Sequence, residues 1–239
     1  MSFLAPSKER STPLYIQIAN NLRTKIADGN IDIGEALPSE REISVLTGAS
    51  RVTVRKAIES LVTEGLLYRR QGSGTFVAPR IEAPSSFLSS FTDDALARGD
   101  KPSVVWIIKA YAHPTKEEAE QLNIPTSADV ARLGRVRYAN DQPLAIENAV
   151  VPKRFLPDLS VIKDSLYDAL AGRGCRPVTG RQRVRASLAT PTEAGLLQTE
   201  EDSEILRIER TTFTADGSTV EFTRSAYRGD RYEFVSDLT

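Results

Sequence analysis

The segment 39–77 constrains the fold of this chain more than any other, because it predicts two helices, a tight turn and a hairpin in a fixed order. Ser39, with Glu42 three residues later, forms a capping box that begins a short helix, and Gly48 ends that helix. Ser50 is the predicted N-cap of the next helix. The apolar stripe of that helix consists of Val54, Ala57, Ile58, Leu61 and Val62. Two strand-like runs, LLYRR and TFVAP, then flank the turn QGSG, so a hairpin follows the helices.

An amphipathic helix is predicted over 13–29, ahead of this segment, because its apolar residues lie four apart. They are Leu14, Ile18, Leu22 and Ile26. Helix, helix, turn, helix and glycine-tipped hairpin is the order of a winged helix-turn-helix, which binds DNA. The net charge of −1 argues against coating nucleic acid through bulk charge, so DNA binding has to come from a local surface.

The outward face of the helix predicted over 51–64 has the side chains that a DNA groove requires. Arg51 and Arg55 lie one turn apart, within reach of guanine edges or phosphates. Lys56 adds a phosphate contact, and the hydroxyls of Ser50 and Thr53 suit phosphate oxygens. The predicted contacts in the hairpin are Arg69, Arg70, Gly72, Ser73 and Gly74. The alternative is that these basic residues only solvate a surface, but their ordered context favours DNA binding.

The stretches PLYIQIANNLRTKIADG and GEALPSEREISVLTGASRVTVRKAIESLVTEGLLYRRQGSGTFV resemble the DNA-binding domain of the GntR family of bacterial repressors. In that family three residues touch the operator: the arginine of the LPSER segment, the arginine of the SR pair and the first glycine of the wing. The resemblance therefore implies operator contacts by Arg41, Arg51 and Gly72. Ala49 stands where the family more often has valine, which is a change in buried packing.

The remaining chain predicts a second domain over 91–239, joined to a first domain over 8–78 by a linker at 79–90 that is rich in serine and proline. Its strand-like runs are SVVWIIKAYA, VARLGRVRYA, LAIENAVVP, RQRVRASLA, ILRIERTTFTA and VEFTRSAYR. Two capping boxes begin short helices between them, one at Thr115 and one at Thr190. Consecutive strands joined by tight turns predict a mostly antiparallel α+β domain.

Arg135 and Arg137 lie two apart on one predicted strand, so their side chains share a face. Two parallel guanidinium groups repel unless an anion lies between them, and a phosphate meets that demand. Glu147 projects from an otherwise apolar strand face and needs an arginine or a ligand hydroxyl as its partner. The structural alternative is an ion pair between Arg135 and a cross-strand glutamate, with no ligand involved.

Two further pairs are candidates for the same site. Ser165 and Tyr167 begin a predicted short helix, where backbone N–H groups favour an anion. Glu221 and Tyr227 lie six apart on one face of a strand. The structural alternatives are a simple helix cap for Ser165 and a core position for Tyr227.

The segments SFTDDALARGDKP, DSLYDAL and SAYRGDRYEF, with the strand of Glu147, resemble the effector-binding UTRA domain of the HutC subfamily, which has a chorismate-lyase-like fold. Within that subfamily the chain resembles the repressors of N-acetylglucosamine use. There the two arginines, the serine and tyrosine and the loop before the first helix hold a sugar phosphate, while two glutamates and a late tyrosine bind the sugar. The implied effector site is Phe91, Thr92, Arg135, Arg137, Glu147, Ser165, Tyr167, Glu221 and Tyr227.

An enzyme is the weaker hypothesis, and its form here is a chorismate-lyase-like activity of the second domain. His113 is the sole histidine and Cys175 the sole cysteine, so a histidine-based triad or metal site cannot be assembled. We therefore expect no catalytic residues, no metal and no cofactor.

The resulting prediction is a homodimeric repressor that binds a palindromic operator in double-stranded DNA. Its release is expected from a phosphorylated amino sugar such as N-acetylglucosamine 6-phosphate or glucosamine 6-phosphate. The alternative is the same regulator with another effector, either urocanate or another sugar phosphate. The start MSFLAPSKERS lacks a signal-peptide pattern and no apolar run reaches about 18 residues, so we expect a cytoplasmic protein without a membrane partner.

Overall fold

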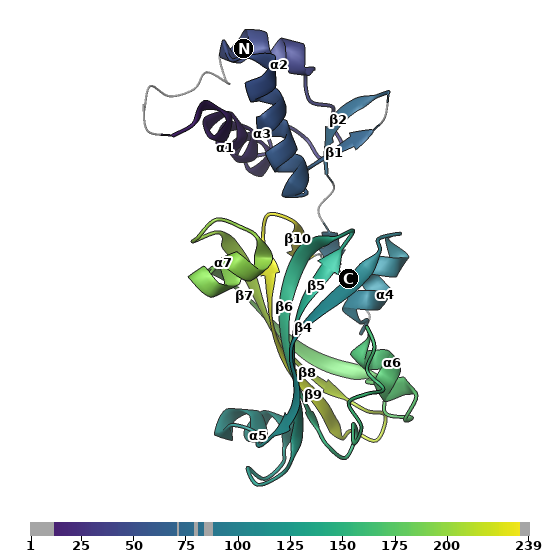
Figure 1. Cartoon of the computed structure of the whole chain (residues 1–239). Helices are drawn as coiled ribbons and strands as arrows, with labels where there is room; N and C mark the ends of the chain where they lie inside the picture. The colour runs from purple at the N-terminus through teal and green to yellow at the C-terminus, as the bar shows by residue number, and fades with distance from the viewer. Residues whose placement is uncertain (1–11, 71, 79–80, 84–87, 235–239) are drawn as a thin grey trace. The chain divides into compact units, whose positions relative to one another are not determined.

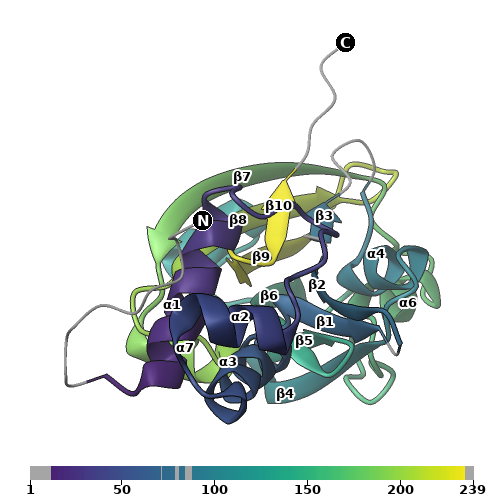
Figure 2. The ribbon, with the colours of Figure 1, turned by 90° about the horizontal axis from the view of Figure 1, so that it is seen from above.

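The computed structural model describes residues 12–70, 72–78, 81–83 and 88–234. They form two compact units, divided between Ile81 and Glu82, and each is described by itself (Figures 1 and 2). The helices are α1 (Leu14–Ala27), α2 (Glu40–Thr47), α3 (Arg51–Thr63), α4 (Phe91–Ala97), α5 (Lys116–Leu122), α6 (Leu166–Ala171) and α7 (Pro191–Leu197). The strands are β1 (Leu67–Arg70), β2 (Gly74–Val77), β3 (Ile81–Ala83), β4 (Pro102–Ala112), β5 (Val130–Ala139), β6 (Gln142–Pro152), β7 (Thr179–Leu188), β8 (Glu204–Phe213), β9 (Thr219–Arg228) and β10 (Tyr232–Phe234).

The first unit has three helices followed by the β1–β2 hairpin, in the predicted order. The predicted capping box at Ser39 is present, and the Ser50 side chain accepts a hydrogen bond from the backbone N–H of Thr53. Gly72 and Gly74 have φ angles of 75° and 119°, so the turn of this hairpin uses backbone conformations that favour glycine. The core between the helices is formed by Ile18, Leu22, Ile43, Val54, Ala57, Ile58 and Leu61.

The second unit is built on a six-stranded sheet in the order β4-β5-β6-β9-β8-β7, with antiparallel pairing throughout. This confirms the predicted α+β fold class with an antiparallel sheet. Asn140 and Asp141 form the two-residue turn between β5 and β6, both with positive φ. A second, two-stranded sheet pairs β10 with β3.

Helices cover both faces of the large sheet, as Figure 1 shows. On one face α5 packs against β9 and α7 against β6. On the other face α6 covers an apolar cluster, and α4 lies against β4. The second face carries the candidate ligand site. None of the described helices has the length and apolarity needed to cross a membrane.

Several predicted boundaries fall on residues that are not described. The predicted start of the first domain at residue 8 lies outside the described residues, as do residues 79–80 and 84–87 of the predicted linker and the last five residues of the second domain. The strand β3 lies within the segment predicted as linker.

Candidate functional site

The first unit presents the predicted outward face of α3 to solvent. Arg51, Arg55 and Lys56 are exposed, and Val52 between them is 77% exposed. The hydroxyls of Ser50 and Thr53 lie 2.8 Å apart and bond to each other within the helix cap. The tip residues Gly72, Ser73 and Gly74 of the hairpin are exposed as well.

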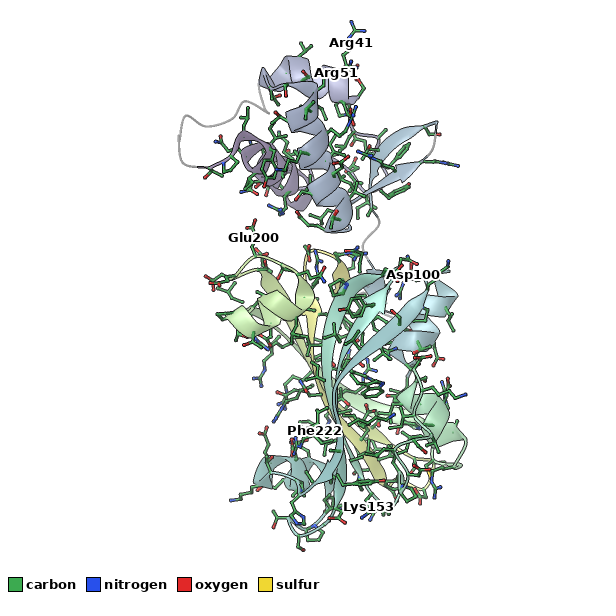
Figure 3. All side chains as sticks on the ribbon, in the orientation of Figure 1. Arg41, Arg51, Asp100, Lys153, Glu200 and Phe222 are labelled. Carbon is green, nitrogen blue, oxygen red and sulfur yellow. The ribbon has the colours of Figure 1, made fainter. Side chains whose placement is uncertain are left out.

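The basic residues of this surface fall into two groups. Arg41 and Arg51 stand at the end of the unit where α2 and α3 begin (Figure 3). Among the described residues neither side chain has a hydrogen bond or ion pair, although the charge of Arg51 helps to lower the pKa of Glu40. Arg55 and Arg69 are instead held by Glu40, which the sequence analysis did not single out. The carboxylate of Glu40 accepts hydrogen bonds from Nε and Nη2 of Arg55 and lies 3.8 Å from Nη2 of Arg69.

The two remaining basic residues that were predicted to contact DNA, Lys56 and Arg70, belong to neither group. Lys56 Nζ lies 4.0 Å from the ring centroid of Tyr15, so its stem is steadied by a cation-π contact while the side chain stays exposed. Arg70 is exposed at the end of β1, beside the hairpin turn.

The hydrogen bonds from Arg55 lower the pKa of Glu40, so this carboxylate stays ionised at neutral pH.

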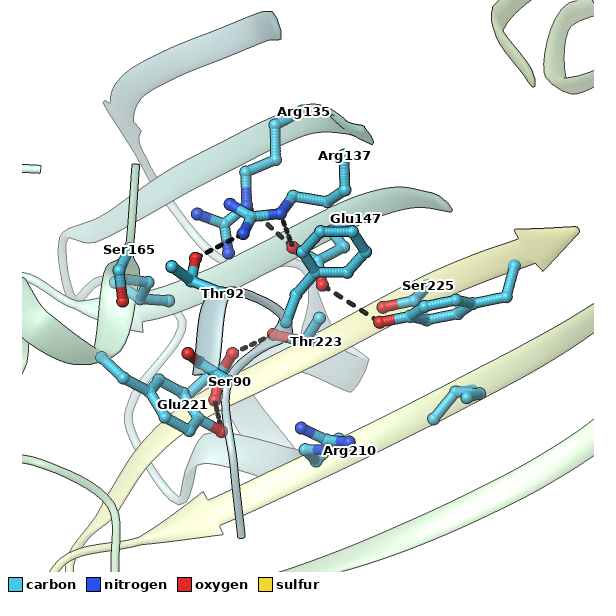
Figure 4. Close-up of a pocket in the computed structure, with 15 residues that line it drawn as sticks. Ser90, Thr92, Arg135, Arg137, Glu147, Ser165, Arg210, Glu221, Thr223 and Ser225 are labelled. Carbon is cyan, nitrogen blue, oxygen red and sulfur yellow. Dashed lines mark hydrogen bonds and ion pairs between the residues drawn. The ribbon is translucent and has the colours of Figure 1, made fainter. Parts of the chain in front are cut away.

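In the second unit, the nine predicted effector residues line one pocket (Figure 4). The pleat explains much of this convergence, because residues two apart on a strand share a face. Arg135 and Arg137 come from β5 and Glu147 from β6, while Glu221 and Tyr227 come from β9. The remaining lining residues that were predicted are Phe91, Thr92, Ser165 and Tyr167.

The two arginines share a carboxylate inside the protein. Arg135 stands directly opposite Glu147 in the β5–β6 register, and its Nε donates to Glu147 Oε2 at 2.9 Å. Nε of Arg137 lies 3.8 Å from the same oxygen. All three are buried, with exposures of 6%, 1% and 7%. Burial alone would raise the pKa of Glu147, but the two guanidinium groups hold it below its usual value.

Arg137 also connects two helices to the floor of the pocket. Its Nη2 donates to Thr92 Oγ1 and its Nη1 to the carbonyl of Asp164, each at 2.6 Å. Its guanidinium carbon lies 4.4 Å from the ring centroid of Phe91. Phe91 and Thr92 were expected in a loop, and that expectation is wrong: they are the first two residues of α4, because Ser90 and Asp93 form a capping box ahead of them.

Glu221 is the second buried carboxylate of the pocket. Its Oε2 accepts hydrogen bonds from the Tyr167 hydroxyl and from Thr212 Oγ1, each at 3.1 Å. Burial and the neighbouring Glu221 carboxylate raise the pKa of Tyr167, which therefore stays a hydrogen-bond donor. The Tyr227 hydroxyl lies 3.4 Å from Oε1 of Glu147. Burial raises the pKa of Tyr227 well above its usual value.

Six lining residues were not predicted: Ser90, Leu166, Ile208, Arg210, Thr223 and Ser225. Thr223 and Ser225 lie between Glu221 and Tyr227 on the same face of β9, so the two-residue period of a strand could have found them. Arg210 reaches the pocket only through the pairing of β8 with β9, where it stands opposite Thr223. No short-range pattern in the sequence specifies that register.

The pocket has an excess of positive charge, since three guanidinium groups face two carboxylates. Nη1 of Arg135 and Nε of Arg137 are buried and have no hydrogen-bond partner among the described residues. Buried donors of this kind are costly to leave unpaired. The arrangement therefore has unused capacity to bind an anion.

Metal binding was the other chemistry to consider in the described part of the chain. Among the described residues, no group of His, Cys, Asp and Glu side chains could hold a metal ion. The His113 side chain is 70% exposed, 3.9 Å from a carboxylate oxygen of Asp129, and Cys175 is a free, half-buried thiol.

Comparison with known families divides the chain in the same order. Residues 14–77 match the model of the bacterial regulatory proteins of the gntR family, and residues 97–233 match the UTRA domain.

Several relatives match this chain over nearly its whole length. The chain is 39% identical to the HTH-type transcriptional repressor NagR of Bacillus subtilis, over 96% of each chain. It is 32% identical to the HTH-type transcriptional regulator GgaR of Escherichia coli, over 95% of this chain and 92% of that one. The crystal structure of PhnF from Mycobacterium smegmatis covers 91% of this chain and 98% of its own, with a TM-score of 0.65 and 28% identity.

Proposed function

The chain belongs to the GntR family of bacterial regulatory proteins and carries a UTRA domain, and we propose that it is a dimeric repressor released from its operator by a phosphorylated amino sugar. Its relatives are transcriptional regulators, as is a structural neighbour of the GntR family from Enterococcus faecalis, so the chain is a regulator and not an enzyme. The family assignment also makes DNA the partner of the first unit and a small molecule the partner of the second.

The observation that carries the effector proposal is the unsatisfied positive charge in the pocket. Arg135 and Arg137 each keep a buried donor that has no hydrogen-bond partner in the described part of the chain, and Arg210 adds a third guanidinium group. A phosphate dianion supplies enough acceptors for these donors, whereas the single carboxylate of urocanate supplies fewer. Glu147 and Glu221 provide acceptors for sugar hydroxyls or an amide N–H beside it. The resemblance of the sequence to the repressors of N-acetylglucosamine use supports an amino sugar as the rest of the ligand.

The coupling we propose runs through Arg137. A bound phosphate competes for the guanidinium group that otherwise donates to Thr92 of α4 and to the carbonyl of Asp164 before α6. Binding would therefore reposition the start of α4, which follows the segment that connects the two units. In a dimer on a palindromic operator, the two recognition helices must lie roughly 34 Å apart, and such a shift would disturb that spacing.

A DNA-binding titration tests the effector. An operator duplex would first be selected from a random pool with the purified full-length protein. Fluorescence anisotropy would then follow its release by N-acetylglucosamine 6-phosphate and by glucosamine 6-phosphate. Unphosphorylated N-acetylglucosamine, inorganic phosphate and urocanate serve as comparison compounds. We expect release only by the sugar phosphates, and an unchanged operator affinity with both of them would refute the effector assignment.

A substitution locates the site. Arg135→Ala should abolish release by the sugar phosphate and leave operator binding within about twofold, because Arg135 lies in the second unit. Arg183→Ala is the matched control, since Arg183 is an exposed arginine of β7 in the same sheet. Loss of both activities in Arg135→Ala would show that Arg135 is needed for folding rather than for effector binding.

A further inference from the structure

A carboxylate lies within the basic DNA-facing surface of the first unit. Glu40 is the first residue of α2, directly before Arg41. DNA presents a dense row of phosphates, so an ionised carboxylate at this place opposes binding unless it has a specific role. The α2 cap does not explain its presence, because the capping box of that helix is formed by Ser39 and Glu42.

The contacts of Glu40 connect three elements. Arg55 on α3 approaches it with two nitrogens: Nε lies 3.2 Å from Oε1 and 3.1 Å from Oε2, and Nη2 lies 2.8 Å from Oε2. Such a forked contact fixes the direction of a guanidinium group as well as its distance. Arg69 on β1 lies 3.8 Å from Oε1 of Glu40 and 3.7 Å from Oε1 of Glu59 on α3.

These exposed ion pairs contribute little to the stability of the fold, but they restrict the direction in which each guanidinium group points. Side chains of Arg55 and Arg69 are about half exposed, at 56% and 47%, and surface ion pairs of this kind contribute little to stability. A free arginine, however, samples many rotamers and binds whichever phosphate it meets. An arginine held by a fork is presented in one orientation before DNA arrives.

We propose that Glu40 is a positioning residue for operator recognition: it aims Arg55, restrains Arg69 beside it, and so restricts the contacts these arginines make with DNA of arbitrary sequence. Arg41 and Arg51, whose side chains have no hydrogen-bonded carboxylate among the described residues, are then the arginines free to adapt to DNA. The inference rests on the proposed operator binding and not on the identity of the effector.

Three variants of the full-length protein separate this role from a plain charge effect. Glu40→Gln removes the charge, and Glu40→Asp keeps the charge but shortens the side chain by one methylene. Glu59→Gln removes a nearby charge that forms an ion pair with Arg69 and acts on Arg55 only through space. Affinities for the selected operator and for a random-sequence duplex would be measured by anisotropy at several salt concentrations. Circular dichroism would first confirm that each variant is folded.

We expect Glu40→Gln to bind random DNA several-fold more tightly and the operator no more tightly, so that the ratio of the two affinities falls about tenfold. The salt dependence on random DNA should steepen by about 0.9 for each freed arginine that gains a phosphate. Glu40→Asp should also lose discrimination, because its carboxylate no longer reaches Arg55. Glu59→Gln should change the ratio by less than about twofold.

Other results would overturn the proposal. Equal effects of Glu40→Gln and Glu59→Gln, or a Glu40→Asp variant that behaves like the wild type, would leave only a charge effect. If Glu40→Gln lost operator affinity only through the base preference at one position, and its affinity for random DNA stayed the same, Glu40 itself would contact that base. A wild-type protein that does not distinguish operator from random DNA would instead refute the proposed operator binding.

Discussion

At the scale of single residues, Glu147 competes with any anionic ligand for the two arginines of β5 in the pocket. Its carboxylate already supplies the anion that Arg135 and Arg137 need, as the cross-strand alternative in the sequence analysis anticipated. It does so incompletely, because Nη1 of Arg135 and Nε of Arg137 have no hydrogen-bond partner among the residues that the structure describes. A phosphate bound as we propose would have to share the two arginines with Glu147, and its repulsion by that carboxylate would be part of the binding free energy.

Replacing Glu147 should change the selectivity of the pocket in a defined direction. In Glu147→Gln the pocket keeps three guanidinium groups and loses one of two carboxylates, so its affinity for inorganic phosphate should rise about tenfold. Isothermal titration calorimetry with inorganic phosphate measures this. Glu221→Gln is the matched control, because Glu221 bonds to Tyr167 and Thr212 rather than to these two arginines, and it should gain less. An unchanged or weaker affinity in Glu147→Gln would contradict the explanation.

The sequence predicts which side chains lie together where this depends on short spacing along the chain. It does not predict this where it depends on the packing of distant elements. The alternation of a strand is enough to place Arg135 with Arg137 on one face, and Glu221 with Tyr227 on one face. Arg210 joins them only after β8 has paired with β9, and Glu40 meets Arg55 only after α2 has packed against α3. Arg210 and the opposite residue Thr223 lie 13 positions apart, and Glu40 and Arg55 lie 15 apart, so neither pair has a periodic signature.

At the scale of elements, two glycines show how the same change can have opposite effects. A Cβ atom at Gly134 in β5 would lie 2.6 Å from Cγ2 of Ile108 on β4 and 3.1 Å from Oδ1 of Asn148 on β6. Gly134→Ala should therefore destabilise the second unit by about 1–2 kcal/mol. At Gly195, in α7, a Cβ would meet open space, and Gly195→Ala should stabilise by about 0.5–1 kcal/mol because glycine disfavours helix interiors.

Urea unfolding checks both variants. The single tryptophan, Trp106, lies in the second unit and reports its unfolding. A Gly134→Ala variant as stable as the wild type would mean that Ile108, which is 40% exposed, turns aside without cost.

The start of α7 predicts a specific acid sensitivity. Hydrogen bonds from Arg207, together with those from Thr190, lower the pKa of Glu193 from 4.5 to about 2. A carboxyl with a depressed folded-state pKa stabilises the fold above its unfolded pKa, and this stabilisation is lost as the pH falls from about 4.5 to about 2. Glu193→Gln should therefore cost about 1–2 kcal/mol at pH 7, a value reduced by solvent screening because Arg207 is 37% exposed.

Comparison across pH isolates this carboxyl from the others. The stability difference between wild type and Glu193→Gln, from urea unfolding followed by Trp106 fluorescence, should shrink towards pH 2.5. Glu201→Gln, at an exposed position in the turn after α7, should show no such trend. A difference that stays constant between pH 7 and pH 2.5 would exclude Glu193 as the titrating group.

Element positions follow the sequence closely because their signals are local. The capping boxes at Thr115 and Thr190 fix two helix starts, and the run VARLGRVRYA coincides with β5. The bulge between Trp106 and Ile108 and the pairing of β10 with β3 were not predicted. Both arise from pairing between strands, which the pattern of one strand does not encode.

At the scale of the whole molecule, two units with separate cores carry separate binding surfaces. Net charge differs only mildly between the two parts of the chain: residues 1–78 hold ten Lys and Arg against eight Asp and Glu, while residues 79–239 hold 21 against 24. Order and approximate extent of the two units follow from composition and motifs. Coupling between the two units cannot be predicted from composition and motifs, because it depends on free-energy differences between states rather than on any pattern of residues.

Linkage makes this coupling measurable from either side. If the effector weakens operator binding by some factor, the operator must weaken effector binding by the same factor, typically about 5- to 150-fold. The Arg135 guanidinium carbon lies 5.3 Å from the ring centroid of Trp106, so an anion that draws on Arg135 should change the fluorescence of this tryptophan. Titrating N-acetylglucosamine 6-phosphate with and without saturating operator gives the shift in Kd. Random-sequence duplex is the control and should shift the Kd less. A Kd that is the same with and without operator, in a protein that the effector does release from DNA, would violate the linkage relation. That outcome would place the releasing site outside the pocket of Arg135.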